Sequence, residues 1–174
     1  MPMVLDTFIQ GNYFPGRRDE TGKQGEPRYV VLHVQDGTNQ GSLDWFQQPT
    51  TQSSVTVLVS LDGEVWRVVR EKDGPWSNGG AQDPTPKAQN GILALGGNPN
   101  IWTLSISAEG QSGDEPTAEQ VEAIAWQVSD WMDRYAIPAD NVLRHADLDQ
   151  VNHASCPGDG LYDVVMTALA RTAS

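Results

Sequence analysis

One short segment holds most of the side chains in this sequence that could bind a metal ion. The chain has three histidines and one cysteine, and the stretch RHADLDQVNHASCPGD contains His145, His153 and Cys156. The remaining histidine, His33, lies near the end of the apolar run YVVLHV. Zinc prefers imidazole nitrogens and thiolates, and three protein ligands leave its fourth tetrahedral position open, as in catalytic sites. Together, His33, His145 and Cys156 therefore favour a catalytic zinc centre over a structural one.

Each of these residues also has an ordinary structural interpretation. A single histidine at the end of a buried strand, such as His33, is more often a hydrogen-bonded core residue than a ligand. A lone cysteine is most often a small buried hydrophobic residue, and His145 and His153 could be loop residues without a chemical role. The spacing is not that of a zinc finger, so composition alone leaves both interpretations open.

The composition excludes several classes of protein. The 174 residues suit one domain with a hydrophobic core, and no run of about eighteen apolar residues predicts a transmembrane helix. A net charge of −12 argues against a nucleic-acid partner and against docking on anionic membranes. A single cysteine excludes an intramolecular disulfide. The first residues lack the pattern of a secretory signal. We expect the protein to be a monomer.

Alternating strand and helix patterns must position these side chains. Gly and Pro are frequent in residues 1–28, which we expect to form an irregular N-terminal arm. Period-two and β-branched patterns predict a strand at 29–34, a hairpin at 53–70 that turns at Asp62-Gly63, and a strand at 101–107. Three- and four-residue apolar spacing predicts helices at 117–138 and about 159–171. SLDWFQQP at 42–49 is expected to form a short helix that stops near Pro49, and residues 71–100 are expected to form a long loop.

These elements predict an α/β fold, a single domain with a central mixed β-sheet flanked by helices. Thr117 and Gln120 form a capping-box pattern at the start of the helix at 117–138, and Pro138 follows its end. The sequence shows no internal repeat and no second domain. We therefore divide the chain into an arm over 1–28 and one domain over 29–174.

At this point the ordered segments VVLH, SSVTVLVSLDGEVWRVVREKDGPW, NIWTLSIS and RHAD…SCPGD-LY resemble a known family. They are similar to the zinc-dependent N-acetylmuramoyl-L-alanine amidases, which include phage endolysins, bacterial cell-wall amidases and peptidoglycan-recognition proteins. The resemblance runs from about Tyr29 to Tyr162, and GNYFPGRR in the arm is similar to the lead-in of amidases from phages of actinobacteria. It implies a peptidoglycan-recognition-protein-like fold and an amidase-like catalytic domain over 29–174.

The resemblance also implies roles for individual residues. His33, His145 and Cys156 match the three zinc ligands, so that the cofactor would be Zn²⁺. Trp76 matches a tryptophan that lines the substrate groove, and Asn100 matches an asparagine before the central strand; we assign both to substrate binding. The partner would be peptidoglycan, and the reaction would be hydrolysis of the amide between N-acetylmuramic acid and L-alanine.

The sequence departs from the family at positions that usually handle protons or stabilise the oxyanion. Residues of other chemistry stand at these places: Val55, Thr56, Ser77, Ser107 and Ala154. A zinc hydrolase still needs a group to take a proton from water. His153 is the best candidate because an unperturbed imidazole titrates near neutral pH. The alternative is that His153 only supports the metal ligands or faces solvent, and Glu109 is a weaker candidate.

Three functions therefore remain open at the level of the sequence. The first is an active zinc amidase that acts as a phage endolysin, present in the host cytoplasm and then released to the cell wall. The second is a catalytically impaired peptidoglycan-binding module of the same fold. The third is a zinc hydrolase for another amide. Retention of Cys156 favours the first, because family members that only bind often lose that ligand.

Overall fold

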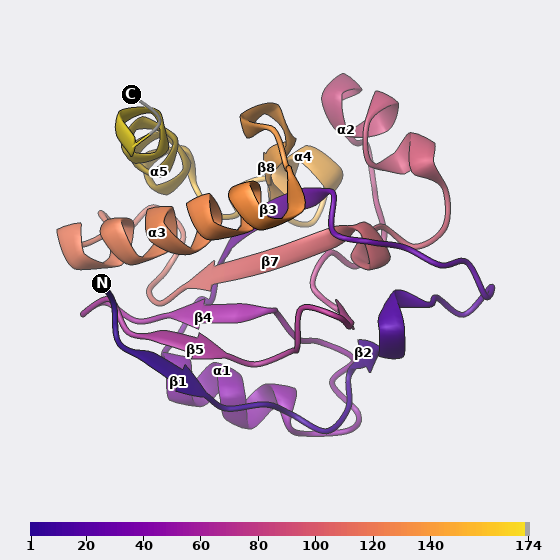
Figure 1. Ribbon diagram of the computed structural model, residues 1–174, viewed down its shortest axis with the longest axis horizontal. Coiled ribbons are helices and arrows are strands. Elements are labelled where there is room, and N and C mark those ends of the chain that lie inside the picture. The colour runs from indigo at the N-terminus through magenta and orange to yellow at the C-terminus, as the bar shows by residue number, and fades with distance from the viewer. Residues whose placement is uncertain (173–174) are drawn as a thin grey trace.

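A mixed six-stranded sheet forms the centre of the computed structural model, which describes residues 1–172 (Figure 1). Neighbouring strands pair in parallel except β5 with β4, which are antiparallel. The strand order is β1 (Val4–Asp6), β5 (Val65–Arg67), β4 (Val57–Val59), β7 (Thr103–Ala108), β3 (Tyr29–Val34) and β8 (Val142–Arg144). The expected α/β fold with a mixed sheet is confirmed.

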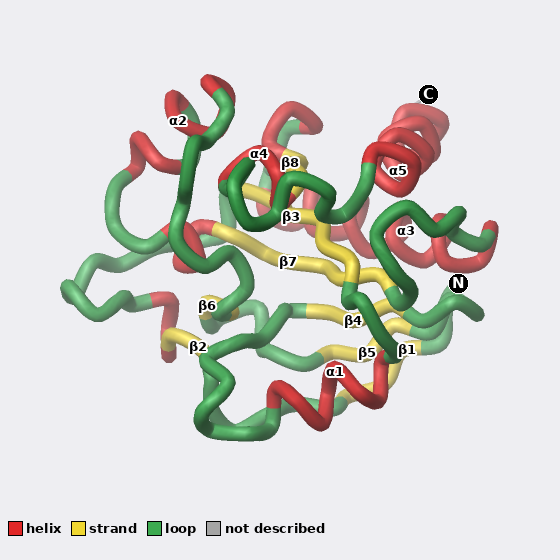
Figure 2. The backbone as a smooth tube through the Cα atoms, turned by 180° about the vertical axis from the view of Figure 1, so that it is seen from behind, coloured by secondary structure: helices red, strands yellow, loops and turns green. Residues whose placement is uncertain are grey.

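Helices cover both faces of this sheet. Two long helices, α3 (Ala118–Tyr135) and α5 (Asp159–Thr172), pack on one face. The other face, toward the viewer in Figure 2, carries α1 (Asn39–Phe46), α2 (Pro86–Asn90) and α4 (His145–Leu148). Short 3-10 helices occur at η1 (Pro15–Arg17), η2 (Leu93–Leu95), η3 (Pro99–Trp102) and η4 (Ala139–Asn141). None of the helices described is long and apolar enough to cross a membrane.

The alternation of side chains along β3 decides which face holds the chemistry. Val30 and Leu32 belong to the core under α3 and α5, whereas Val31 packs with α2 and α4 on the other face. Because successive side chains of a strand point to opposite faces, His33 shares the face of Val31. The same alternation in β7 places Leu104 and Ile106 in the core below α3.

The helix α3 forms where its apolar spacing and its cap predict it. The hydroxyl of Thr117 accepts a hydrogen bond from the backbone N–H of Gln120, and the chain leaves the helix at Ala136 with φ of 52°. Only half of the expected capping box forms, because the Gln120 side chain donates to the carbonyls of Val59 and Glu109 instead. Gln120 thereby ties the helix to the sheet as well as to its own first turn.

The predicted hairpin is confirmed, and its turn requires glycine. β4 and β5 pair antiparallel with Leu58 opposite Trp66. Gly63 has a φ of +82°, and a Cβ there would lie 2.8 Å from the Glu119 carbonyl oxygen. Both a positive φ and this close approach to α3 exclude larger residues without strain.

Two segments differ from the sequence-based expectation of irregular structure. Within the arm, β1 joins the sheet beside β5, and β2 (Tyr13–Phe14) pairs with β6 (Gly74–Pro75). The long loop over 71–100 contains β6, α2 and two 3-10 helices. These elements are two to five residues long, which is too short to show a periodic pattern. The division into an arm over 1–28 and a domain over 29–174 stays a prediction.

One helix boundary and one strand also differ from the sequence-based prediction. The helix expected at 42–49 begins earlier, at Asn39, because the Thr38 side chain caps it by accepting the N–H of Gly41. Its first turn is polar and contains a glycine, so apolar spacing does not reveal it. The strand β8 was not predicted at all, since three residues between η4 and α4 carry no alternation.

Candidate metal centre

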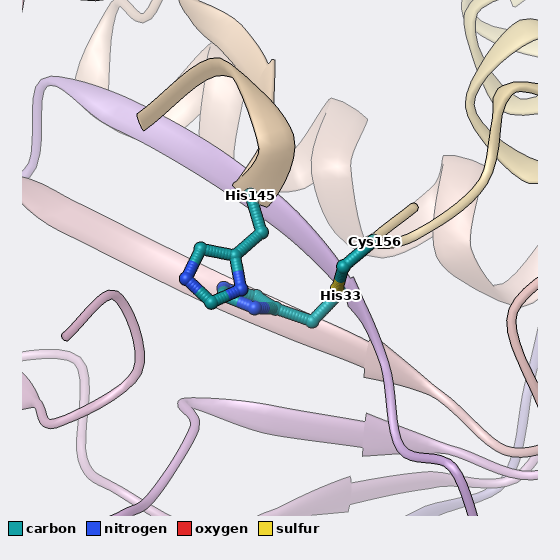
Figure 3. A group of neighbouring side chains, drawn as sticks. All are labelled: His33, His145 and Cys156. Atoms are coloured by element: carbon teal, nitrogen blue, oxygen red, sulfur yellow. The ribbon is translucent and has the colours of Figure 1, made fainter. Parts of the chain in front are cut away.

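One side chain from β3 and two from the segment at 145–156 converge on one face of the sheet (Figure 3). His33 lies near the end of β3, His145 is the first residue of α4, and Cys156 precedes α5. β3 and β8 are parallel neighbours with Leu32 opposite Arg144, so His33 and His145 follow matched positions at the same sheet edge. One candidate ligand atom from each of the three residues lies within 4.8 Å of the others. The expected convergence of His33, His145 and Cys156 is therefore present.

Hydrogen bonds hold Cys156 against both histidine-bearing elements. Its carbonyl accepts the N–H of Ala146 in α4 at 3.0 Å, and its Sγ accepts the N–H of Val34 in β3 at 3.4 Å. The preceding turn is fixed by Asp149, whose carboxylate accepts the backbone N–H groups of Val151 and Asn152. The loop that carries the thiol is thus pinned at both of its contacts with the site.

The electrostatics of the site suit a cation. Burial lowers the pKa of His33 well below its ordinary value, and His145 and His153 lower it further. Burial, followed by the nearby His153, lowers the pKa of His145 to about 4. Both imidazoles are therefore neutral at pH 7 and offer a lone pair. Burial raises the pKa of Cys156 to about 11, so a metal would displace the thiol proton as it binds.

The tautomer of His145 is fixed by its surroundings. Its Nε2 lies 3.2 Å from the backbone carbonyl oxygen of Asn78. A carbonyl oxygen only accepts hydrogen bonds, so Nε2 carries the proton and Nδ1 keeps the lone pair for a metal. With two imidazoles and a thiol, this donor set fits a zinc ion with one position left open.

The site opens into a surface groove of about 590 Å³. One wall comes from α1 and includes Trp45, a residue that is 54% exposed. The remaining lining mixes apolar and polar side chains. Val34, Phe46 and Val55 are apolar, and the polar residues come from α1, β7 and several loops: Gln35, Asp36, Thr38, Ser42, Ser53, Ser54, Ser77 and Ser107. A groove that carries hydroxyl and amide side chains beside three metal donors can accept a substrate rich in hydroxyl and amide groups.

The proposed proton carrier lies beside the metal ligands. The ring of His153 stacks on that of His145, with centroids 3.9 Å apart and planes 22° apart, and it lines the groove. Its backbone N–H donates to the Asp149 carbonyl at 3.3 Å, and its own carbonyl accepts from Cys156 at 2.9 Å. The structure therefore brings His153 to the site, while its catalytic role stays a prediction.

The two residues assigned to substrate binding, Trp76 and Asn100, are not among the described residues that line the groove. Trp76 packs edge-on against Phe14, with centroids 5.5 Å apart. Asn100 is 4% exposed, and its Oδ1 accepts the backbone N–H groups of Ser77 and Asn78. Asn100 shapes the loop that meets His145, and substrate contact by either residue stays a prediction.

The positions that depart from the family pattern fall in two groups. Val55, Ser77 and Ser107 line the groove, so side chains without a titratable group surround the metal donors there. Thr56 is 1% exposed and exchanges hydrogen bonds with Ser105 of β7, which makes it part of the sheet. Glu109 accepts the N–H of Leu61 at the hairpin and lies outside the groove lining of the described chain.

Sequence reasoning missed three residues near the site. Asp36 lines the groove and contributes to the raised pKa of Cys156 after the larger effect of burial. Trp45 forms part of the groove wall, and Asn78 contacts His145. Only Asp36 left a signal in the sequence, because it follows His33 by three residues in a loop after a strand end.

Solved structures share this fold across nearly the whole chain. A selenomethionine derivative of AmpD has a TM-score of 0.71 at 18% identity and covers 97% of this chain and 93% of its own. A mutant endolysin from Bacillus subtilis has a TM-score of 0.68 at 19% identity, with 97% and 99% covered. At these identities the likeness shows the fold alone.

Sequence comparison defines the relationship further. An N-acetylmuramoyl-L-alanine amidase A from Achromobacter lyticus is 28% identical over 86 residues, which are 49% of this chain. The match spans only 38% of that relative. The profile of the N-acetylmuramoyl-L-alanine amidase family matches residues 23–159, which include all three candidate metal ligands and His153. The chain therefore belongs to the N-acetylmuramoyl-L-alanine amidase family.

Proposed function

We propose that this protein is a zinc-dependent N-acetylmuramoyl-L-alanine amidase. It hydrolyses the amide between the lactyl group of N-acetylmuramic acid and L-alanine in bacterial peptidoglycan. The observation that carries the proposal is the cluster of His33, His145 and Cys156 in the lining of an open groove. Membership of the amidase family supports the same substrate class.

The three ligands divide the work of holding the ion. His33 and His145 are neutral donors, and Cys156 supplies negative charge once its proton leaves. When bound, zinc polarises the scissile carbonyl and lowers the pKa of water, which generates a nucleophile at neutral pH. The protein contributes the fixed positions of the donors, because β3, α4 and the turn before α5 are hydrogen-bonded to one another.

His153 is the residue to which we assign proton transfer. A ring nitrogen of His153 takes a proton from the attacking water and returns it to the leaving amine of alanine. Its position supports this role, because its ring stacks on the ligand His145 and faces the groove. The other lining positions where family members carry such groups hold Val55, Ser77 and Ser107 instead.

We assign the groove to the muramyl peptide. The polar residues in its walls offer hydroxyl and amide groups to sugar and peptide, and Trp45 offers an exposed indole. Trp76 and Asn100 are proposed to contribute to binding. Asn100 is positioned to act through the Ser77–Asn78 backbone that it holds.

The biological role that we propose is that of a phage endolysin, a bacteriolytic monomer that is made in the host cytoplasm and released to the cell wall. The lead-in GNYFPGRR and the shared fold with a Bacillus subtilis endolysin support this role. The alternative is a peptidoglycan-binding module of impaired activity. The replacement of titratable groups by Val55, Ser77 and Ser107 at the groove favours that alternative.

Digestion of purified sacculi separates these two functions. The protein is incubated with sacculi, with and without a chelator, and new alanine amino termini are counted. An amidase releases them, stops on chelation and recovers on addition of zinc. A His145→Ala variant serves as the matched inactive control, because it removes one ligand. Binding of sacculi with stoichiometric zinc but no release would establish the binding module instead.

A further inference from the structure

Asn78 lies in the loop after β6 and is 1% exposed. Three of its four polar groups have partners. Its backbone N–H donates to Oδ1 of Asn100 at 2.9 Å, and its side-chain Nδ2 donates to Oγ1 of Thr103 at 3.0 Å. Its carbonyl oxygen accepts from Nε2 of His145 at 3.2 Å. Asn78 therefore links Thr103 at the start of β7 to His145 of the metal centre.

Its fourth polar group, Oδ1, is a hydrogen-bond acceptor without a donor among the described residues, and His33 carries a ring nitrogen that is also without a partner there. Oδ1 of Asn78 and Nε2 of His33 are both buried without a hydrogen-bond partner in the part of the chain that the structure describes. One is an acceptor and the other can be a donor. Burial is the main influence on His33 and lowers its pKa, and the Asn78 side chain opposes that effect. Asn78 also contacts His145 through its carbonyl oxygen, and the ring centroids of His145 and His33 lie 4.4 Å apart, so the Asn78 side chain is a neighbour of His33.

Thr103 sets the direction of the Asn78 amide. The hydroxyl of Thr103 donates to the carbonyl oxygen of Asn100 at 3.4 Å, so its lone pairs are left to accept from Asn78. Only the Nδ2 end of the amide can donate, so it must face Thr103. Oδ1 then points away from Thr103, which leaves it available to His33.

We propose that Asn78 orients both histidine ligands of the metal centre, its carbonyl holding Nε2–H of His145 and its Oδ1 accepting Nε2–H of His33. Both rings then present Nδ1 to the ion in one tautomer. This inference rests on the proposed zinc function, but it concerns a positioning residue and not a catalytic one. Partners of this kind typically change metal affinity or activity by about 10–100-fold when they are removed.

The two contacts of Asn78 predict an asymmetric result on mutation. Asn78→Ala removes the acceptor for His33 but keeps the backbone carbonyl that holds His145. Long-range proton–nitrogen NMR spectra of the metal-free protein report the tautomer of each imidazole. The wild type should show Nε2–H at both histidines, and Asn78→Ala should change His33 and leave His145 as it was. The histidine that is not held by the side chain is thus an internal control.

Zinc affinity, measured by competition with a chelator, provides the second readout. Asn78→Ala should weaken zinc binding about 10–100-fold, and Thr103→Val should weaken it less, because the amide remains but loses its anchor. Asn78→Asp should stay within a few-fold of the wild type, since a carboxylate also accepts from a metal-bound histidine. When the variants are loaded with cobalt, their absorption spectra should differ from the wild type most in Asn78→Ala, less in Thr103→Val and least in Asn78→Asp.

Asn12→Ala is the matched control for simple loss of a buried asparagine. Asn12 is 7% exposed and its Nδ2 donates to the carbonyls of Phe46 and Gln48, away from both histidines. It should lower stability but change neither the tautomers nor the zinc affinity. An unchanged His33 tautomer in Asn78→Ala, or equal losses in Asn78→Ala and Asn78→Asp, would overturn the proposal. Failure of the wild type to bind zinc would overturn the proposed function, while the metal-free spectra still decide whether Asn78 orients His33.

Discussion

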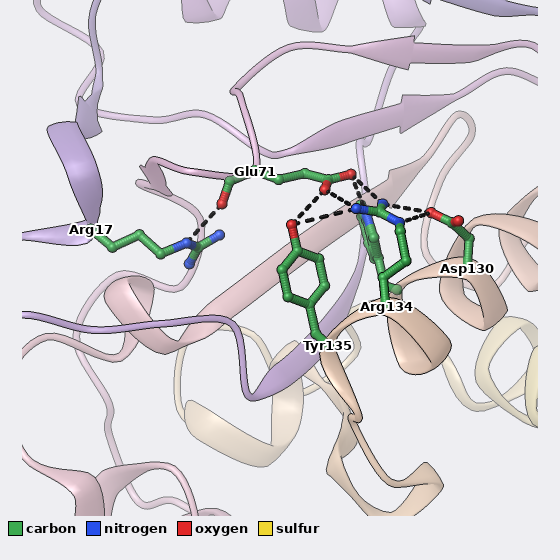
Figure 4. A network of polar contacts seen from close by, with 6 residues as sticks. Arg17, Glu71, Asp130, Arg134 and Tyr135 are labelled. Atoms are coloured by element: carbon green, nitrogen blue, oxygen red, sulfur yellow. Dashed lines mark hydrogen bonds and ion pairs between the residues drawn. The ribbon is translucent and has the colours of Figure 1, made fainter.

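Two groups of polar side chains lie on opposite faces of the sheet and differ in how well their hydrogen bonds are satisfied. On the α3 face, the carboxylate of Glu71 accepts from Arg134 at 2.7 and 2.8 Å, from Tyr135 at 2.7 Å and from the Trp131 indole at 2.8 Å (Figure 4). Arg134 also pairs with Asp130. We call these five residues the Glu71 cluster.

The metal centre on the other face is the opposite case. Nε2 of His33 is buried without a hydrogen-bond partner among the described residues, and the rings of His33 and His145 lie only 4.4 Å apart. The cluster of His33, His145 and Cys156 carries no formal charge at pH 7, because burial disfavours the charged form of each.

The difference separates a group that stabilises the fold from a group that is suited to bind a ligand. A network whose donors and acceptors are matched stabilises the folded chain and has no capacity left for a ligand. Buried groups that are close together, neutral and incompletely paired cost stability unless something else binds them. Mutations should therefore separate the two groups by their effects on activity and on stability.

The largest effect is expected from removal of a metal ligand. His33→Ala, His145→Ala or Cys156→Ala should each reduce zinc content and release of alanine amino termini to background, because two ligands hold the ion poorly. The loss should exceed the roughly 10–100-fold typical of groups that only support a ligand. Metal analysis and the sacculus assay measure both quantities. Full activity in all three variants would end the metal hypothesis.

The next effect concerns His153. His153→Ala should lower turnover by about 10²–10⁴-fold, the usual contribution of a positioned acid or base. Zinc content should remain near stoichiometric, because His153 stacks on a ligand without belonging to the three-donor cluster. Steady-state kinetics on soluble muramyl peptides, with metal analysis of the same samples, tests this assignment. Wild-type turnover would show that the stacking is structural only.

The sequence was informative where a pattern is long or where chemistry-bearing residues are rare. The helix at Ala118–Tyr135 and the hairpin turn at Gly63 follow from periodicity and turn chemistry. His33, His145 and Cys156 stood out because the chain has so few such residues. Their convergence depends on the pairing of β3 with β8, and the three residues of β8 gave no signal.

The contacts that surround the three candidate metal ligands could not be predicted from the sequence. Asn78 contacts His145 through its backbone carbonyl, which every residue has. The residue type at position 78 therefore could not predict this contact. Trp45 lies in the helix that was predicted, but only the packing of α1 beside the metal centre shows that it lines the groove. Asn100 matched a family position, but only the structure shows that it holds the backbone of Ser77 and Asn78.

Mutation of the Glu71 cluster should lower the stability of the fold and leave zinc affinity unchanged. Glu71→Ala leaves the indole N–H of Trp131, a fully buried residue, without its acceptor. An unsatisfied buried donor costs about 1–3 kcal/mol of unfolding free energy, and Glu71→Gln should cost less because it keeps an acceptor. Urea unfolding of the metal-free protein measures this loss. Zinc affinity should not change, and a fall in affinity at unchanged stability would contradict the separation of the two groups.

The smallest effect is the acid dependence of the same cluster. Burial raises the pKa of the Glu71 carboxyl, but hydrogen bonds from Arg134, Trp131 and Tyr135 outweigh it and lower that pKa from 4.5 to about 2. Because the folded value is depressed, the contribution is fully present above pH 4.5 and is lost as the pH falls toward 2. The stability of the wild type should therefore fall more steeply in this window than that of Glu71→Gln.

The comparison with Glu71→Gln isolates one carboxyl from the others. Asp19 and Asp149 also have lowered pKa values, since each accepts several backbone hydrogen bonds that outweigh the effect of burial. Both remain in the variant, so their contributions cancel in the difference between the two curves. Urea midpoints of the chelator-treated proteins, taken at intervals from pH 6 to about pH 2, give that difference. Parallel curves would mean that Glu71 is bonded equally well in the unfolded chain, and the Glu71 cluster would no longer account for the stability of this face.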